Sequence, residues 1–326
     1  MVSFVVFVGS FVLVYWFIQL AIWFYNQFFF SSSKIKKLSG SWASKKNKKK
    51  LKIFHIVVTG ATAGIGEGMS EELASRGLNI ILISRSQNKL ERLAMDLEKD
   101  HGVKVKCVAI DFSNATNSTY ENLKDEIKDL DVTILVNNVG INTDIPELFL
   151  DITEEECNSL VNVNCNSALN ITRAILPGMV SKKRGVVINL SSYTGQHPSP
   201  FLSVYSATQA FNNAWSIALK SEYSKFGIEV MSLLPMYVQS NMTGFKKTSM
   251  FVPSARHFAK RIVNSIGNGL LPLEYSPVWT HSLVQNVMFL IPESLRQSYV
   301  RGQMTGVRAA VMKKIQREKD NQNKTQ

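Results

Sequence analysis

The residues whose types and spacing most suggest chemistry in this chain are Ser192, Tyr205 and Gln209. A tyrosine can protonate an alkoxide if the pKa of its hydroxyl, about 10, is lowered by its surroundings. A serine hydroxyl can stabilise a developing oxyanion by hydrogen bonding. Taken singly, Ser192 and Tyr205 are more often a strand-end hydroxyl and a structural helix tyrosine. The inference of carbonyl chemistry therefore depends on their spacing and on the elements that hold them.

A glycine cluster supplies the second chemical signal. The segment TGATAGIG, residues 59–66, follows a β-branched run and opens a helical pattern. Glycines at positions 60, 64 and 66 allow a tight turn and a close approach to a phosphate, which the helix N-terminus then faces. The spacing G-x-x-x-G-x-G differs from the usual dinucleotide G-x-G-x-x-G. The segment also lacks the G-K-[ST] of a nucleoside triphosphatase loop, which argues against that class of enzyme.

The second expected strand ends in Ser84 and Arg85. A dinucleotide fold selective for NAD would place an acidic residue there, to hold the ribose 2′-hydroxyl. A small hydroxyl residue followed by an arginine instead suits a 2′-phosphate, because guanidinium pairs with phosphate in bidentate fashion. The pattern therefore favours NADPH over NADH, against the simpler possibility of a surface arginine at a strand end.

Strand and helix patterns alternate along the body of the chain. Buried strands are expected at 53–60, 78–84, 103–111, 132–140, 185–192 and 228–235, with a short apolar segment at 270–275 as the candidate for a seventh. Helices are expected at 66–76, 87–102, 119–130, 154–181 and 203–225. This alternation predicts an α/β fold with a Rossmann-type, doubly wound parallel sheet. Ligands in such folds bind at the carboxyl ends of the strands, where the motifs above lie.

With these motifs in place, the chain resembles the short-chain dehydrogenase/reductase family over nearly its whole length after residue 50. The resemblance is carried by TGATAGIG, by NNVG at 137–140, by the serine pair 191–192 and by a tyrosine 13 residues after Ser192. The phrases SRSQNKLERL, NVNCNSALNITRAILPGMV, INLSS and VYSATQAF are similar to one branch. That branch contains the membrane-anchored 17β-hydroxysteroid dehydrogenases and very-long-chain 3-oxoacyl-CoA reductases of the endoplasmic reticulum.

The resemblance implies a role for each matching residue. The expected catalytic positions are Asn164 as the anchor of a water relay, Ser192 for the substrate carbonyl, Tyr205 as proton donor, and position 209. The expected cofactor contacts are Gly60, Gly64, Ile65 and Gly66 for the phosphates, Ser84 and Arg85 for the 2′-phosphate, Asp111 for adenine, Asn137 and Tyr205 for the ribose side, and Val238 and Ser240 for the nicotinamide. The cofactor that these positions imply is NADPH/NADP, and no metal is expected.

The chain departs from the family pattern Tyr-x-x-x-Lys at Gln209. On a helix, positions i and i+4 share a face, so the family's ammonium lies beside the phenol. It lowers the phenol pKa, binds the ribose and continues the proton relay, whereas glutamine supplies hydrogen bonds but no positive charge. An opposite charge nearby shifts a pKa by ~1–3 units. Lys220 is eleven residues further along, about 16 Å on the helix axis, and is too far away to substitute.

Two hypotheses follow from this departure. In the first, the chain is an NADPH-dependent oxidoreductase that reduces a ketone on a lipophilic substrate, such as a steroid or a long-chain 3-oxoacyl-CoA. In the second, it is a pseudoenzyme that keeps the cofactor and acts as a membrane-attached binding or scaffold protein. The glycine turn, Arg85, Asn164, Ser192 and Tyr205 favour the first hypothesis, and Gln209 favours the second.

The N-terminal 30 residues contain no charged side chain and are long enough to span a bilayer as a helix. A cleaved signal peptide fits less well, because no positive segment precedes the apolar run. We therefore expect four regions: a transmembrane anchor at 1–30, a basic linker at 31–52, the short-chain dehydrogenase/reductase domain at 53–310 and a polar tail at 311–326.

The net charge of +12 is concentrated at the two ends of the chain. Nine lysines and no acid lie between residues 34 and 52, and the segment after residue 307 is also basic, which leaves the body nearly neutral. This distribution argues against nucleic acid as a partner. Lysines just after a membrane span indicate that the body faces the cytosol. They could also contact anionic lipid, although a solvated linker explains them as well.

The remaining expectations concern redox state, location and assembly. Cys107, Cys157 and Cys165 are odd in number and match no metal-site spacing, so free thiols in a reducing compartment are expected. Family analogy and the anchor place the protein in the endoplasmic reticulum membrane as a single-pass protein. The partners expected are a lipophilic keto or hydroxy small molecule, the membrane, and a second copy in a homodimer.

Overall fold

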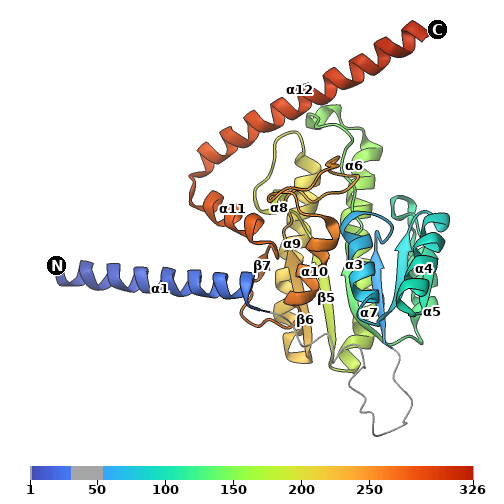
Figure 1. Cartoon of the computed structure of the whole chain (residues 1–326), viewed down its shortest axis with the longest axis horizontal. Coiled ribbons are helices and arrows are strands. Elements are labelled where there is room, and N and C mark those ends of the chain that lie inside the picture. Colours follow the sequence, from blue (N-terminus) through green and yellow to red (C-terminus); the bar gives the residue numbers. More distant parts are fainter. Residues whose placement is uncertain (1, 31–53, 326) are drawn as a thin grey trace.

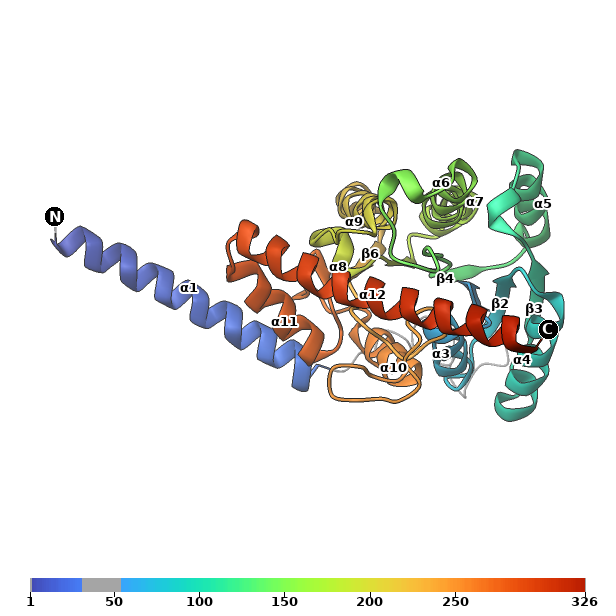
Figure 2. The same cartoon turned by 90° about the horizontal axis from the view of Figure 1, so that it is seen from above.

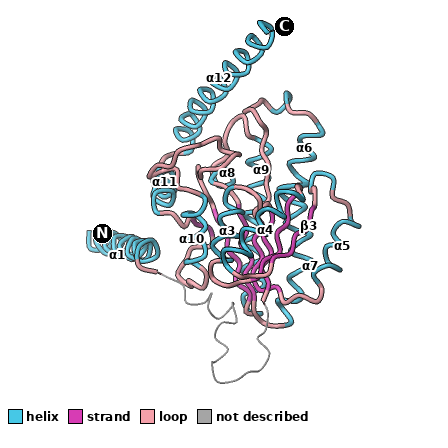
Figure 3. The backbone as a smooth tube through the Cα atoms, turned by 45° about the vertical axis from the view of Figure 1, so that its right-hand side comes forward, coloured by secondary structure: helices cyan, strands magenta, loops and turns pink. Residues whose placement is uncertain are grey.

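The computed structural model describes residues 2–30 and 54–325 and contains a seven-stranded, fully parallel sheet (Figures 1 and 3). The strand order is β3-β2-β1-β4-β5-β6-β7. The strands are β1 His55–Thr59, β2 Asn79–Ser84, β3 Val105–Ala109, β4 Val132–Asn137, β5 Gly185–Leu190, β6 Ile228–Leu233 and β7 Glu274–Tyr275. The predicted fold class is confirmed. The seventh strand is shorter than the apolar segment at 270–275 suggested.

Helices cover both faces of this sheet. The α-helices are α1 Val2–Phe28, α3 Gly64–Ala74, α4 Gln87–His101, α5 Asn117–Ile127, α6 Glu154–Val161, α7 Ser167–Ser181, α8 Tyr193–Gln196, α9 Ser203–Tyr223, α10 Ala255–Ser265, α11 Trp279–Leu290 and α12 Glu293–Thr325. The expected helix at 154–181 contains a π-helical turn, Asn162–Asn166, between α6 and α7. The boundary expected at residue 310 falls within α12, which continues through it without a break.

Alternating strand residues build two separate cores. In β1, Ile56 and Val58 pack toward α3, α4 and α10, whereas Val57 between them packs toward α5, α7 and α9. All three residues are fully buried. Burial of an aliphatic side chain contributes roughly 1.5–3 kcal/mol, so a strand that is apolar on both faces is stable only between two helix layers. The continuous apolar runs in the sequence have this physical cause.

The chain ends reach outside the body. In Figure 1, α1 extends away from the sheet on the side of α11. Phe7–Phe28 in α1 is the one helical stretch in the described residues that is long and apolar enough to cross a membrane. Figure 2 shows α12 crossing over the body, where Arg308 bonds Asp151 at 3.2 Å. The expected basic linker at 31–52 lies outside the described residues. The three cysteines are unpaired, as predicted.

The crossing of α8 and α9 depends on a residue without a side chain. A Cβ on Gly195 would lie 2.7 Å from the carbonyl carbon of Gln209 and 2.8 Å from its oxygen. Both atoms are backbone, so they cannot rotate away. Because α8 follows Ser192 and α9 carries Tyr205, this contact also sets how closely the two hydroxyl-bearing segments approach.

We therefore expect Gly195→Ala to lower the free energy of unfolding by ~1–3 kcal/mol through overpacking. Gly178→Ala is the matched control, because a Cβ there meets nothing within 4 Å. Alanine inside a helix is favoured over glycine by roughly 0.5–1 kcal/mol, so the control should be neutral or stabilising. Chemical denaturation of the two variants beside the wild type measures both effects. Equal stability of Gly195→Ala and wild type would contradict the close contact.

Candidate active site

The glycine turn lies between β1 and α3 and needs glycine for two different reasons. Gly60 and Gly64 have φ values of +61° and +57°, in the left-handed region that side chains disfavour. Gly66 is required by space, because a Cβ there would lie 2.2 Å from the carbonyl oxygen of Gly60. Asn138 holds the turn from β4 by donating from Nδ2 to the carbonyl oxygen of Thr59 at 2.9 Å.

The N-terminus of α3 has no side-chain cap. Its N-cap residue, Ala63, cannot accept a hydrogen bond from the first turn. The first N–H groups of a helix have no partner within the helix, so this end can accept an anion. Ile65 and Gly66, which the resemblance assigns to the phosphates, lie in this first turn. The arrangement is consistent with a diphosphate held over the turn.

The end of β2 presents the residues expected to select the cofactor. The hydroxyls of Ser84 and Thr62 lie 2.9 Å apart, which joins the strand end to the glycine turn. Arg85 is exposed, and its side chain has no hydrogen bond or ion pair to any other described residue. Asp111 is also exposed and caps the turn after β3 by accepting from the backbone N–H of Ser113 at 3.0 Å. Its expected contact with adenine remains a prediction.

Ser192 and Tyr205 are brought together from two elements. Ser192 is the N-cap of α8 and accepts from the N–H of Thr194 at 3.2 Å. Tyr205 lies in the first turn of α9, with its phenol close enough to the Ser192 side chain for Ser192 to affect its pKa. Burial raises the pKa of the Tyr205 phenol, and the neighbouring Ser192 side chain offsets part of that rise. The phenol is therefore protonated at neutral pH.

Gln209 is buried one turn after Tyr205, with 4% of its surface exposed. Its main-chain carbonyl accepts from the hydroxyl of Ser191 at 2.7 Å, while its side-chain oxygen has no partner among the described residues. Among the residues that the structure describes, no cation contributes to the pKa of Tyr205. The side chain at the family's lysine position thus keeps its place on the helix without supplying charge.

The π-helical turn presents Asn164 to α9 and to the loop after β4. The side chain of Asn164 accepts from the N–H of Ile141 at 2.8 Å and donates to its carbonyl at 2.9 Å. Nδ2 also donates to Thr208 Oγ1 at 3.0 Å. The main-chain carbonyl of Asn164 accepts from Asn212 Nδ2 at 2.8 Å. The main chain of the residue expected to anchor the water relay is therefore bonded to a side chain of α9.

Asn137 ends β4 within a directional chain of buried hydrogen bonds. Ser216 Oγ donates to the main-chain carbonyl of Asn212 and therefore accepts from Asn189 Nδ2 at 2.8 Å. Asn189 Oδ1 in turn accepts from Asn137 Nδ2 at 2.8 Å. This direction leaves Asn137 Oδ1 without a donor among the described residues, and Asn212 Oδ1 is in the same situation. Both asparagines line the same cavity, which is large enough for about one water molecule.

The loop after β6 closes the other side of the glycine turn. A Cβ on Gly64 would lie 3.0 Å from Cβ of Ser240, so this loop touches the turn. Thr243 Oγ1 donates to the carbonyl of Val238 at 2.6 Å, and its N–H donates to Ser240 Oγ at 3.3 Å. The structure thus gathers the residues expected around the nicotinamide beside those expected around the phosphates. The individual contacts with a cofactor remain predictions.

Asn212 is the residue that the sequence analysis missed. It lies seven positions after Tyr205 and three after Gln209, so all three share a helix face. The signal was available as a polar residue at the third position of that face. A polar residue inside a helix does not reveal its partner, however, and the carbonyl of Asn164 comes from a segment nearly fifty residues earlier.

Comparison with known sequences agrees with this geometry. A profile of the family described as "short chain dehydrogenase" matches residues 54–250. The very-long-chain 3-oxoacyl-CoA reductase of Podospora anserina is 36% identical over 264 residues, which are 79% of this chain and 74% of that protein. The protein of the same name from Rattus norvegicus is 36% identical over 263 residues, which are 80% of this chain and 83% of that protein.

Solved structures resemble the chain in the same way. A short-chain dehydrogenase from Sphingobium yanoikuyae in complex with NADPH superposes with a TM-score of 0.59 at 25% identity, covering 65% of this chain and 83% of that one. A structure of a 7β-hydroxysteroid dehydrogenase reaches a TM-score of 0.67 at 20% identity, covering 76% of this chain and 96% of that one. The second likeness concerns the fold alone.

His197, at the end of α8, makes the free energy of unfolding depend on pH. It is 3% exposed and packs against Tyr193, with ring centroids 4.8 Å apart. Burial, reinforced by Arg296 and opposed by Glu293, lowers the pKa of His197 from 6.5 to about 4. As the pH falls from 6.5 towards 4, the unfolded chain takes up a proton here that the folded chain does not.

We therefore expect the free energy of unfolding to fall across this window, and this contribution to be fully present above pH 6.5. His197→Gln removes the titrating group, so its melting temperature should fall less over the same range. Thermal unfolding at a series of pH values measures the two slopes. Identical slopes in the variant and the wild type would show that His197 is not protonated differently in the folded and unfolded states.

Proposed function

Because this chain belongs to the short-chain dehydrogenase family, we propose that it is an NADPH-dependent oxidoreductase that reduces the ketone of a long-chain 3-oxoacyl-CoA. The neighbouring side chains of Ser192 and Tyr205 beside the glycine turn carry this proposal. The names of the relatives from Podospora anserina and Rattus norvegicus supply the substrate class. A steroid ketone is the alternative substrate within the same reaction.

The described residues fit the proposed cofactor. The left-handed glycines and the uncapped start of α3 suit the diphosphate, and exposed Arg85 beside Ser84 suits a 2′-phosphate. When bound, NADPH supplies the hydride. Ser192 then holds the carbonyl oxygen by hydrogen bonding, and the protonated phenol of Tyr205 donates its proton to the alkoxide that forms.

Two neutral amides replace parts of the family's proton relay. Gln209 stands where the resemblance places a lysine, and Asn212 Nδ2 binds the main-chain carbonyl of Asn164, the residue expected to anchor the relay water. A phenol without a neighbouring cation keeps a raised pKa, so it is a weaker acid and donates its proton to the alkoxide less readily. We therefore propose a reductase whose turnover is limited by proton transfer.

The second candidate function is a cofactor-binding protein without turnover, attached to the membrane through α1. The observation that favours it is again the neutral side chain of Gln209, together with the bonded carbonyl of Asn164. The two candidates share the cofactor site. They differ only in whether Tyr205 delivers a proton.

The deciding experiment measures NADPH oxidation by the full-length protein with long-chain 3-oxoacyl-CoAs and keto-steroids. Tyr205→Phe should abolish turnover. Gln209→Lys should raise the rate about tenfold or more and move the alkaline limb of the pH–rate profile down by ~1–3 units. Gln209→Lys combined with Asn212→Val should gain further, because the Asn164 carbonyl becomes free. Ala207→Lys, exposed on the same helix, is the control for added charge.

The outcomes separate the two candidates. Wild-type protein that binds NADPH but turns over no faster than Tyr205→Phe would reject the reductase and leave the cofactor-binding protein. If the wild type is active and Gln209→Lys turns over at the same rate as the wild type and the Ala207→Lys control, the charge at position 209 does not limit the reaction. Absence of NADPH binding would reject both candidates.

Cofactor selection has its own test at Arg85. A hydrogen bond to a charged group contributes about 1.5–3 kcal/mol, so Arg85→Ala should weaken NADPH binding by roughly ten- to a hundredfold. Binding of NADH should change little, because NADH has no 2′-phosphate. Titration of nucleotide fluorescence gives both dissociation constants. Arg92→Ala, an exposed arginine of α4, is the matched control, and equal loss of both nucleotides in Arg85→Ala would contradict the assignment.

A further inference from the structure

Helix α11 is inverted relative to a helix that faces water. Its buried residues are polar: Thr280, His281, Ser282 and Gln285. Its large exposed residues are apolar: Trp279 at 37%, Leu283 at 41%, Val287 at 50%, Phe289 at 70% and Leu290 at 68% exposure. Asn286 is an exposed polar residue on the same side. A surface helix in water shows the opposite arrangement, with its apolar stripe toward the core.

The inverted orientation is held by hydrogen bonds on the buried side. Thr280 Oγ1 donates to the carbonyl of Met250 at 2.9 Å, and Gln285 Nε2 donates to that of Leu234 at 2.6 Å. His281 Nδ1 accepts from the N–H of Met236, so its Nε2 is the donor to the carbonyl of Phe251 at 3.0 Å. Rotation of α11 to bury its apolar side would break these bonds and leave buried polar groups without partners.

The same helix lies against the end of α1. Trp23 Nε1 donates to Ser282 Oγ at 2.8 Å, and the rings of Phe28 and Trp279 have centroids 6.3 Å apart. Trp23 lies inside the candidate span Phe7–Phe28, about 7–8 Å of helix before its end. A membrane that contains this span therefore also reaches the first turn of α11.

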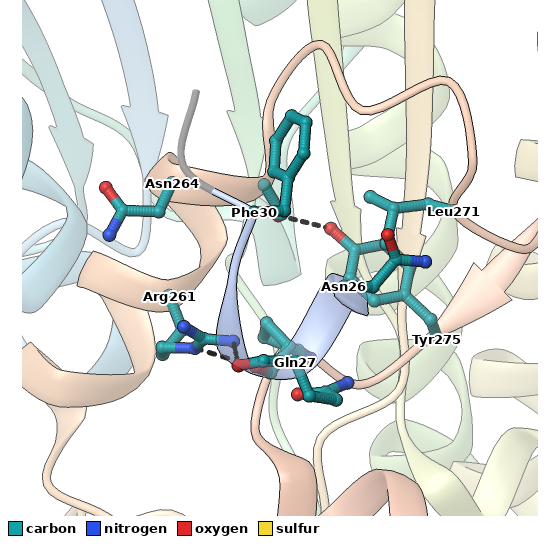
Figure 4. A pocket seen from close by; sticks show the side chains of 9 residues that line it. Asn26, Gln27, Phe30, Arg261, Asn264, Leu271 and Tyr275 are labelled. Carbon is teal, nitrogen blue, oxygen red and sulfur yellow. Dashed lines mark hydrogen bonds between the residues drawn. The ribbon is translucent and has the colours of Figure 1, made fainter. Parts of the chain in front are cut away.

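The last turn of α1 is fixed to the body as well, as Figure 4 shows. The guanidinium of Arg261 in α10 donates to the carbonyl of Gln27 and to that of Pro277, the latter at 3.1 Å. A cation at the C-terminal end of a helix satisfies carbonyls that have no partner within the helix. Asn26 donates to the carbonyl of Leu270 at 3.2 Å. These contacts set the position of the body relative to the span.

We propose that the apolar face of α11 (Trp279, Leu283, Val287, Phe289 and Leu290) is embedded in the surface of the membrane that α1 spans. This inference rests on α1 being a membrane anchor. The 12 residues of α11 extend about 18 Å, too short to cross a hydrocarbon core of about 30 Å, so the helix lies in the interface. A lipid surface is the occupant because the exposed face continues directly from the end of the span.

This placement bears on the proposed substrate. The buried side of α11 holds the loop at Met250 and Phe251 and the end of β6 at Leu234, from which the segment with Val238 and Ser240 departs. The loop beside the expected nicotinamide site is thus attached to a helix in the membrane surface. A long acyl chain partitions into that surface, and this site would receive it from the lipid side.

Photocrosslinking of the full-length protein in phosphatidylcholine vesicles tests the proposal. The photoreactive residue p-benzoyl-phenylalanine is placed, one at a time, at Phe289 and Leu290 of α11, at Phe17 of α1 and at Met95 of α4. Met95 is 63% exposed, and its helix α4 lies on the far side of the body from α11 (Figure 1), so Met95 is the matched control. The expected result is a protein–lipid adduct by mass spectrometry from positions 289, 290 and 17, and none from position 95.

The possible results separate the embedded face from the anchor. Lipid adducts from position 17 without any from 289 and 290 would overturn the embedding of α11 and leave the anchor intact. Crosslinked dimers from 289 and 290 would overturn it in favour of a second copy of this chain. Absence of lipid adducts at all positions would overturn both the anchor and the embedded face, while NADPH oxidation by the same samples reports separately on the proposed function.

Discussion

The arrangement of the site depends on how a single π-helical turn satisfies its backbone. At Asn162–Asn166 the helix between α6 and α7 widens, and the carbonyl of Asn164 accepts from Asn212 of α9 instead of from its own helix alone. The side chain of Asn164 binds both backbone groups of Ile141 after β4. One residue therefore joins the helix that carries Tyr205, the neighbouring helix and the end of a central strand.

Buried amides take the place of charge throughout this region. Asn137, Asn189 and Ser216 form a chain of hydrogen bonds whose direction is set by the main-chain carbonyl of Asn212. Gln209, three residues before Asn212 on the same helix, is neutral as well. A burial that would be costly for an unpaired lysine is tolerable for an amide. The same neutrality leaves the phenol of Tyr205 without the cation that would lower its pKa. At position 209, stability thus favours a neutral side chain, whereas proton transfer by Tyr205 favours a cation.

Helix α1 and the site are connected through the elements after β6. The loop after β6 touches the glycine turn at Gly64, and α11 holds the next part of that loop by hydrogen bonds from its polar side. Helix α1 in turn bonds to α10 and α11 through its last two turns. Helix α1 is therefore packed into the body rather than joined to it only through the chain, and the strand ends have a defined position relative to it.

The sequence by itself determined the alternation of elements, the parallel sheet, the glycine turn and the pairing of Ser192 with Tyr205. These features are local or periodic: apolar runs require two helix layers, and glycines mark turns. It also located the missing charge, because the i, i+4 relation needs only helix geometry. The boundaries were less accurate, as at β7, since the end of a strand depends on its neighbour.

Only the tertiary structure decided which polar groups meet. Asn212 and the carbonyl of Asn164 are far apart in the chain, and no periodicity relates them. The inversion of α11 was equally hidden, because an amphipathic pattern does not say which face is inside. The polar face lies inside because its side chains hydrogen-bond to the main-chain carbonyls of Met250 and Phe251. In both cases the deciding factor was the requirement that buried hydrogen-bonding groups find partners, and those partners come from distant segments.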